Sequence, residues 1–223
     1  MNSPRELRKY IFDVFLQTSR APVVEEMMVR FHADRAEIVT RLRELESAHH
    51  ILLLPGTERI LMANPFSNLP TPFRVSAGGT QYFGNCAWDA IAFHVMLDQD
   101  VHVSSSCHHC GGPVELDLRG GRNVSDPAKN TLVFLGTPVS KWYDNLVATC
   151  SNTMVFFLSQ DHLNEWKKAH PGWTGETLTV EKMIDVVTPI SKGRTTLEYQ
   201  MPPRSQLMAY WGSLGLRGPF WKF

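Results

Sequence analysis

The sequence predicts an α+β protein in which a small helical part precedes a larger part built on a mainly antiparallel sheet. Apolar residues near the N-terminus recur at steps of three and four residues, which is the spacing of one helix face. Farther along, short β-like runs alternate with helical segments and are separated by paired glycines, a pattern typical of antiparallel sheet. Prolines at 65, 70 and 72 lie between the two parts. We therefore expect an N-terminal module at 1–63, a proline-rich linker at 64–75 and a second domain at 76–223.

The N-terminal module is predicted to hold three helices. The first runs from Pro4 to Thr18, where one face is lined by Leu7, Tyr10, Ile11, Val14 and Phe15. The second is expected from Pro22 to Phe31, with the proline in its first turn, and the third from the N-cap Asp34 to about Ala48. The next stretch, HHILLLPGTERILMA, indicates a hairpin of two short extended runs. Three helices followed by a hairpin are typical of a winged helix.

Balanced charge argues against nucleic acid as a partner. The chain carries 22 Lys and Arg against 22 Asp and Glu, so it has no net cationic field to attract phosphate. The third helix would enter the DNA groove in a winged helix, and its charges also balance: Arg35, Arg41 and Arg43 against Glu37, Glu44 and Glu46. We therefore expect this winged-helix-like module to be a structural lid or a dimerisation module.

The second domain is predicted from β-like runs and helical segments that follow one another irregularly. The runs are Phe73–Val75, Val101–Ser105, Val114–Leu118, Leu132–Leu135 and Met154–Leu158. The helices are Cys86–Leu97, Trp142–Ala148, Gln160–Ala169 and Val180–Val187. The stretch from Met201 onward is rich in proline, glycine and aromatic residues, and we expect it to cover this domain.

The composition predicts a cytoplasmic globular protein without a membrane partner. Hydrophobic residues make up 43% and charged residues 20% of the chain, a balance that excludes a disordered tail. The apolar runs are far shorter than the roughly 20 residues that a membrane-spanning helix needs. The opening MNSPRELRKYIF lacks the apolar segment of a secretory signal. The four cysteines are therefore expected to be thiols or metal ligands rather than a disulfide framework.

The segment GNCAWDAIAFHVML places a thiol and a carboxylate at the start of a helix. With Asn85 as the cap, Cys86 and Asp89 share a face of the first turns, where the helix dipole favours a thiolate. Burial and a neighbouring thiolate would raise the pKa of Asp89, which is then expected to be protonated near neutral pH. A buried small residue beside a first-turn carboxylate is the plainer explanation of such a pair taken alone.

The remaining cysteines allow several interpretations. Cys107 and Cys110 lie in the turn SSSCHHCGGP, which is half of a zinc-ribbon signature. A zinc site would be completed by His108 and His109 or by distant ligands; a redox pair is the alternative, although such pairs usually open a helix. A structural role is the leading interpretation. Cys150 follows a short predicted helix and precedes an apolar run, and by itself it is consistent with a plain core cysteine.

Five landmarks occur in order over roughly Met62 to Ala169: the entry NPFSNLPTPFRV, the CAWD helix start at 86–89, the SSSC segment ending at Cys107, the TC at 149–150, and FFLSQDHLNEWKKAHPG. As an ordered set they resemble the bacterial organomercurial lyase (alkylmercury lyase) family. The N-terminal module also fits the architecture of that family. The resemblance implies an alkylmercury-lyase-like catalytic domain that cleaves carbon–mercury bonds by protonolysis, giving a hydrocarbon and mercuric ion held by thiolates.

The resemblance also implies roles for individual residues. In the family the first cysteine of the helix start attacks mercury, and the aspartate three residues later protonates carbon. The cysteine before the FF strand completes mercury coordination. These roles fall on Cys86, Asp89 and Cys150, so Cys86 and Cys150 would hold the Hg(II) product. Cys107 matches a cysteine regarded as structural. The chemistry agrees, since mercury(II) is a soft cation that prefers thiolates.

The implied partners are an organomercurial substrate, excess cellular thiol as mercury acceptor, and mercuric reductase as a recipient of Hg(II), with no required cofactor. This chain departs from the family at Cys110, whose CHHC turn indicates either a zinc ion at Cys107 and Cys110 or a change of substrate. Two alternatives therefore stay open. One is a winged-helix sensor of soft metals or thiol-reactive compounds, and the other is a lyase-like enzyme acting on a different carbon–heteroatom bond.

Overall fold

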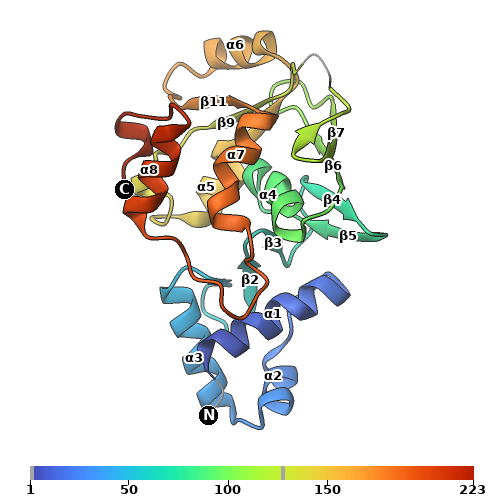
Figure 1. The fold of residues 1–223 in the computed structure, drawn as a ribbon, viewed down its shortest axis with the longest axis vertical. Helices are drawn as coiled ribbons and strands as arrows, with labels where there is room; N and C mark the ends of the chain where they lie inside the picture. Colours follow the sequence, from blue (N-terminus) through green and yellow to red (C-terminus); the bar gives the residue numbers. More distant parts are fainter. Residues whose placement is uncertain (1–2, 127–128) are drawn as a thin grey trace.

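The computed structural model describes residues 3–126 and 129–223. Within these residues the fold is α+β, and all paired strands in its three sheets are antiparallel, as the sequence predicts. The first three helices lie at one end of the molecule, and the larger sheets with the later helices form the other end (Figure 1). No helix in the described part is long and apolar enough to cross a membrane.

The first three helices are α1 (Pro4–Thr18), α2 (Val24–Phe31) and α3 (Arg35–Ser47). As predicted, the side chain of Asp34 caps α3 by accepting the backbone N–H of Glu37. The prediction for α2 is wrong at its start, because Pro22 lies outside the helix. Val23 is the N-cap with extended backbone, and its N–H donates to the carboxylate of Glu26, which fixes the helix start after it.

A small sheet follows the helices and reaches into the proline-rich stretch. Its strands are β1 (Leu52–Leu53), β2 (Ile60–Ala63) and β3 (Phe66–Ser67), in the order β1-β2-β3. The predicted hairpin is the β1–β2 pair. Strand β3 continues the ladder within 64–75, because the backbone after Pro65 is extended and pairs with β2.

The largest sheet has the order β5-β4-β6-β7-β8. Its strands are β4 (Arg74–Ala77), β5 (Thr80–Phe83), β6 (Val101–Ser106), β7 (Pro113–Arg119) and β8 (Arg122–Asn123). Helix α4 (Ala87–Leu97) connects β5 to β6 along the chain and is buried along nearly its whole length. Its sequence is apolar all round, which is typical of a helix in the middle of a core.

The third sheet lies next to the largest one and has the order β10-β9-β11. Its strands are β9 (Leu132–Leu135), β10 (Met154–Phe157) and β11 (Glu176–Thr179). A parallel bridge between Cys107 and Phe156 joins it to the end of β6. The helices around it are α5 (Leu146–Thr153), α6 (Gln160–Ala169), α7 (Val180–Ser191) and α8 (Arg204–Ser213).

The helix expected at Trp142–Ala148 is misplaced by the sequence prediction. A short 3-10 turn occupies Val139–Lys141, and α5 begins only after Asn145, whose side chain accepts the backbone N–H of Ala148. Cys150 therefore lies within α5 rather than after a helix. The strands β5, β8 and β11 were not anticipated, because they are short and carry several polar residues.

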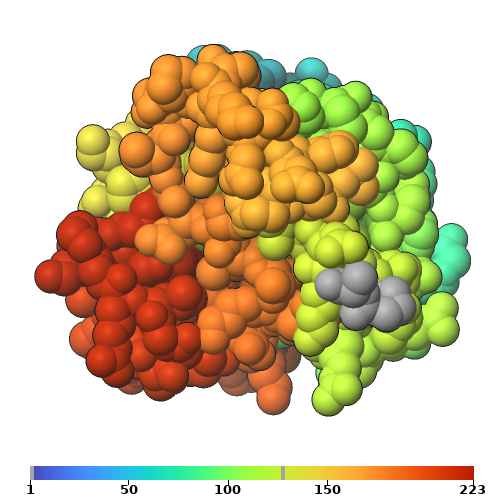
Figure 2. All heavy atoms as spheres, turned by 90° about the horizontal axis from the view of Figure 1, so that it is seen from above, coloured from blue at the N-terminus to red at the C-terminus, as the bar shows by residue number. Residues whose placement is uncertain are grey.

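The C-terminal segment covers the second half of the molecule. The indole N–H of Trp211 in α8 donates to the carbonyl of Val186 in α7, and its ring packs against Trp88 and Trp142. In the view from above, the red C-terminal residues pack directly against the orange part of the chain that holds α7 (Figure 2). The connection between α7 and α8 runs down to α1, where Arg8 donates to the carbonyls of Arg194 and Thr196 (Figure 1).

Candidate functional site

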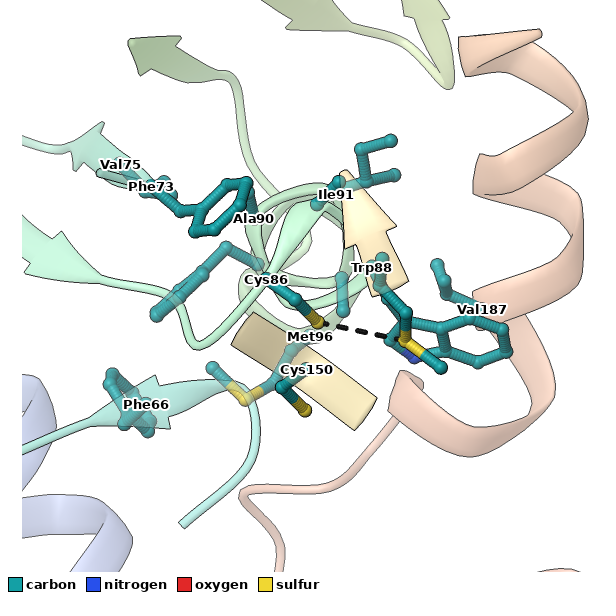
Figure 3. Packing of buried hydrophobic residues seen from close by; sticks show 14 of the residues in the cluster. Phe66, Phe73, Val75, Cys86, Trp88, Ala90, Ile91, Met96, Cys150 and Val187 are labelled. Carbon is teal, nitrogen blue, oxygen red and sulfur yellow. Dashed lines mark hydrogen bonds between the residues drawn. The ribbon is translucent and has the colours of Figure 1, made fainter. Parts of the chain in front are cut away.

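The three residues with predicted chemistry meet in one buried place. Cys86 lies at the start of α4, Asp89 in its first turn and Cys150 in α5. Their ligand atoms all lie within 4.8 Å of one another, and each residue is at most 2% exposed. The two cysteines approach each other from different helices (Figure 3). The fold therefore brings Cys150 next to Cys86, which lies 64 residues before it in the sequence.

The start of α4 differs in one detail from the prediction. Cys86, not Asn85, is the N-cap, and its extended backbone carries the sulfur into the site. The side-chain N–H of Asn85 instead donates to Oδ2 of Asp89 over 2.9 Å. Asn85 is buried and also donates to the backbone carbonyls of Pro65 and Phe66. It therefore orients the carboxylate rather than the helix.

Cys86 is a thiol in the resting site. Burial raises its pKa well above the ordinary range, and the neighbouring Cys150 and the charge of Asp89 raise it further. The expectation that the helix dipole favours a thiolate here is therefore wrong. The dipole contributes about 1 kcal/mol, which is less than the cost of burying an unpaired anion. The sulfur lies 3.6 Å from Oδ2 of Asp89 and 3.8 Å from the sulfur of Met154, the contact dashed in Figure 3.

Asp89 carries a pKa raised to about 6, mainly by burial. The hydrogen bond from Asn85, the positive charge of Arg194 and the hydrogen bond from Cys86 all oppose this rise. The predicted direction is therefore confirmed, but the rise is too small to leave Asp89 mostly protonated at pH 7. The proton at neutral pH lies on Cys86, and the acceptor beside it is Asp89.

The site opens into a cavity of about 60 Å³. Its lining includes apolar and aromatic side chains from α4, from the segment between the 3-10 turn and α5, and from α5 itself: Trp88, Ala92, Trp142, Tyr143 and Leu146. His49, at the end of the N-terminal helices, also lines the cavity and stacks on Tyr143 with ring centroids 3.7 Å apart. No sequence signal marks His49 as a site residue, because only the fold brings it to Tyr143.

Arg194 is a second lining residue that the sequence prediction missed. It is 4% exposed, and its Nη1 donates to the hydroxyl of Tyr199 over 3.2 Å. Its Nε is buried without a hydrogen-bond partner in the described part of the chain. Its charge acts on Asp89 and lowers the pKa of that carboxyl. The buried guanidinium of Arg194 thus acts on the carboxyl of Asp89. The two residues are far apart in the sequence, so no sequence motif relates them.

Cys107 and Cys110 form a second cluster, away from the cavity, with His162 of α6. The three ligand atoms lie within 4.8 Å of one another. Burial raises the pKa of Cys107, but backbone N–H groups directed at its sulfur, such as that of Cys110, and the contact with His162 bring it down to about 7. The predicted ligands His108 and His109 are outside the cluster; His108 packs on Trp166 instead.

The buried site combines two kinds of chemistry. Two sulfurs at close range are a binding site for a soft, two-coordinate metal ion, and the carboxylate beside them can take up and deliver a proton. All four cysteines are free thiols. The aromatic walls keep water away from an apolar group bound next to the sulfurs.

Comparison with known proteins agrees with this geometry. The alkylmercury lyase family model (MerB) matches residues 66–192. The alkylmercury lyase of Bacillus cereus is 28% identical over 118 residues, which are 53% of this chain and 52% of that protein. The alkylmercury lyase of Staphylococcus epidermidis is 31% identical over 106 residues, 46% of this chain and 47% of that protein. The chain thus spans about half the length of the curated relatives it matches.

A solved structure, the mercury-bound form of MerB2, shares the fold. The TM-score is 0.67 at 21% identity, and the match covers 86% of this chain and 91% of that one. The fold likeness extends beyond the family match into the N-terminal residues, since residues 66–223 by themselves are less than 86% of the chain. Because the family model matches more than half of the sequence and contains the Cys86, Asp89 and Cys150 cluster, the chain belongs to the alkylmercury lyase family.

Proposed function

We propose that this protein is an organomercurial lyase that cleaves the carbon–mercury bond by protonolysis. The observation that carries the proposal is the buried cluster of Cys86, Asp89 and Cys150, with ligand atoms within 4.8 Å of one another. Two thiolates and one acid are the groups that this reaction needs. The family membership supports the same activity.

The first step is transfer of the substrate to Cys86. The sulfur forms a bond to mercury and displaces the thiolate that carried the organomercurial. The proton of Cys86 passes to Asp89, whose Oδ2 lies 3.6 Å from the sulfur and whose pKa of about 6 leaves it ionised at neutral pH. Metal binding and proton release are coupled here, because only the thiolate binds mercury.

The second step uses Cys150 and the proton now held by Asp89. Cys150 gives up its proton, which the displaced thiolate takes away, and its sulfur forms a second bond to mercury. Two thiolates add electron density to mercury and weaken its bond to carbon. The electron pair of that bond takes the proton from Asp89, which releases the hydrocarbon and restores the carboxylate. Hg(II) stays bound to Cys86 and Cys150.

The cavity fits the organic group of such a substrate. A wall of Trp88, Trp142 and Tyr143 surrounds the space next to the sulfurs, and an organic group placed there is shielded from water. At about 60 Å³ the cavity holds a small group such as methyl. A cavity that holds benzene measures about 150 Å³, so an aryl group would extend toward the opening.

Product release needs a mercury acceptor rather than a resident cofactor. We propose excess cellular thiol for this role, since thiol exchange at mercury passes the ion on without a change of oxidation state, and mercuric reductase as a later recipient. A reducing compartment such as the cytoplasm fits the chemistry, because Cys86 and Cys150 must stay thiols. A zinc ion at Cys107 and Cys110 would take no part in this reaction.

For the N-terminal module at 1–63 we propose a winged-helix-like structural role rather than DNA binding. The arginines of α3 are engaged by carboxylates: Arg35 with Glu25 and Glu58, Arg41 with Glu37, and Arg43 with Glu46. Phosphate would have to displace these partners. His49 contributes to the cavity wall, so the module closes the site against the domain at 76–223.

The proposal is tested by product release. Reduced protein is incubated with phenylmercury and excess thiol, and benzene is followed beside Cys86→Ser and a thiol-only control. Catalytic benzene from the parent and none above background from the variant would support the lyase. Tight mercury binding without benzene would contradict it and favour a trap, a sensor or another carbon–heteroatom bond as substrate.

A further inference from the structure

The CHHC turn and helix α6 together form a side-chain cluster that the lyase reaction does not use. Cys107 and Cys110 come from the turn between β6 and β7, and His162 comes from the first turn of α6, 55 residues after Cys107. Cys107 is buried, Cys110 is exposed and His162 is half-buried. Three soft ligands from two separate elements thus meet near the surface.

The distances in this cluster are those between ligands of one tetrahedral metal ion. Nδ1 of His162 lies 3.4 Å from the sulfur of Cys107 and 3.4 Å from the sulfur of Cys110. A tetrahedral zinc with Zn–S of about 2.3 Å and Zn–N of about 2.0 Å separates sulfur and nitrogen by about 3.5 Å. A neutral Nδ1 has a single lone pair, so it cannot accept a hydrogen bond from both thiols at once.

The backbone of the turn is built to hold sulfur as thiolate. The N–H groups of His109, Cys110 and Leu158 are directed at the sulfur of Cys107, and the N–H of Gly112 lies 3.4 Å from the sulfur of Cys110. Gly111 has φ of +70°, which glycine adopts without strain, and its N–H donates to the carbonyl of Cys107 to close the turn. N–H donors around sulfur are expected where a metal ligand must stay deprotonated.

The backbone of His162 is held at the start of its helix. Ser159 caps α6 and accepts the backbone N–H of His162. The turn is likewise fixed, because the N–H of His108 donates to the carbonyl of Phe156 in β10. Contacts that involve no metal therefore hold the backbone on both sides of the cluster.

We propose that Cys107, Cys110 and His162 bind a structural zinc ion that ties the β6–β7 turn to α6. A set of two thiolates and one imidazole suits a borderline-soft d¹⁰ ion and does not suit magnesium or calcium. The fourth position faces the surface at exposed Cys110 and takes water or His109, whose ring centroid is 5.5 Å from that of His162. A redox pair is disfavoured, since the CxxC lies in a strand turn and not at a helix start.

The zinc ion would join two sheets. Cys107 pairs with Phe156 in the bridge between β6 and β10, and β10 begins at Met154, which contacts Cys86. The metal would therefore hold the strand that supports the lyase site, although it lies outside that site. Its removal should lower the melting temperature of the protein, and any loss of lyase activity would follow from the loosened strand.

The test is metal content, measured on full-length protein made in zinc-supplemented medium without mercury. Elemental analysis after gel filtration should find about one zinc per chain. The exposed Cys110→Ser and the helix-surface variant His162→Gln should retain less than about one tenth of it. Cys86→Ser and His102→Gln are matched controls from outside the cluster, and both should keep the parent level.

A spectrum separates this site from the lyase site. Cobalt(II) in place of zinc should give the visible bands of a tetrahedral ion and a sulfur-to-cobalt charge-transfer band, which Cys110→Ser loses and Cys86→Ser keeps. The proposal is overturned if parent and Cys110→Ser hold equal zinc, if Cys86→Ser loses the metal, or if the reduced parent takes up neither metal. The last result would leave the lyase proposal untouched, since benzene release is measured independently.

Discussion

The sulfur of Cys86 lies 3.6 Å from Oδ2 of Asp89, and the two residues are one helical turn apart at the buried start of α4. Burial raises both pKa values, but that of Asp89 only to about 6 and that of Cys86 well above its ordinary range. The resting proton is therefore on sulfur. In the proposed reaction, mercury binding at Cys86 releases that proton to Asp89, which later protonates carbon.

Cys150→Ser should keep substrate binding and slow cleavage. The variant still binds the organomercurial through Cys86, but the second thiolate that weakens the carbon–mercury bond is missing, so we expect a rate loss of about 100-fold or more. Mercury retention after gel filtration and hydrocarbon release measure the two properties separately. His102→Gln, at an exposed position of β6 outside both cysteine clusters, is the control and should cleave at the parent rate. Equal rates for Cys150→Ser and the parent would remove Cys150 from the mechanism.

Asp89→Asn should stabilise the protein at alkaline pH. Folding raises the pKa of Asp89 from about 3.9 to about 6, so the folded state favours the protonated form. This contribution is fully present below pH 4 and is lost as pH rises through 6, at a cost of up to about 3 kcal/mol. Both hydrogen bonds reach Oδ2, which an amide oxygen can replace.

The measurement is the melting temperature of parent and Asp89→Asn at pH 4 and pH 8. The variant should melt several degrees higher at pH 8 and close to the parent at pH 4. Asp185→Asn, at an exposed position of α7, is the control and should show no such difference. A variant that is less stable than the parent at pH 8 would mean that the Asp89 charge is compensated within the fold.

The lyase rate should rise with pH through about 6. Ionised Asp89 takes the proton of Cys86, so protonation of the free enzyme below this pKa slows the first step. We expect kcat/KM to fall on the acid side with an apparent pKa of about 6. The pH profile should be the same with two carrier thiols of different pKa. Such agreement would assign the titration to the enzyme rather than to the carrier thiol. A rate that falls as pH rises through 6 would instead require Asp89 to be protonated before substrate arrives.

Arg194 is expected to act as a positioning residue through its charge on Asp89. Arg194→Met removes a buried cation that lowers the pKa of Asp89, so the acid limb of kcat/KM should move up by about one pH unit. Arg194→Lys should restore the parent profile in part. Tyr199→Phe, which removes the hydrogen-bond partner of Arg194 but keeps the charge, should leave the limb in place. An unmoved limb in Arg194→Met would contradict this role.

The sequence predicts much of the fold because local signals coincide with the helix ends. The bounds of α1 and α6 agree with the prediction, and Asp34 caps α3 as expected. The error near Cys150 arose because aromatic residues before Asn145 suggest an earlier helix, whereas the cap lies at Asn145 itself. The short polar strands carry no periodic signal long enough to detect.

The candidate site could also be predicted only in part from the sequence. Cys86 and Asp89 share one turn, so their proximity follows from helical spacing. Nothing in the sequence places Arg194 or His49 in the cavity, and nothing pairs His162 with the CHHC turn. Those contacts depend on how the sheets and helices pack. The pKa of Cys86 could not be predicted either, because it is decided by burial, which the helix-dipole argument left out.

Proton delivery from Asp89 to carbon can be followed in a single turnover without added thiol. Reduced protein is mixed with less than one equivalent of methylmercury, and methane in the headspace and mercury on the protein are both measured. The parent should release about one methane per mercury and retain Hg(II). Asp89→Asn should retain methylmercury intact and release no methane. Methane from Asp89→Asn at the parent rate would show that Asp89 is not the proton donor.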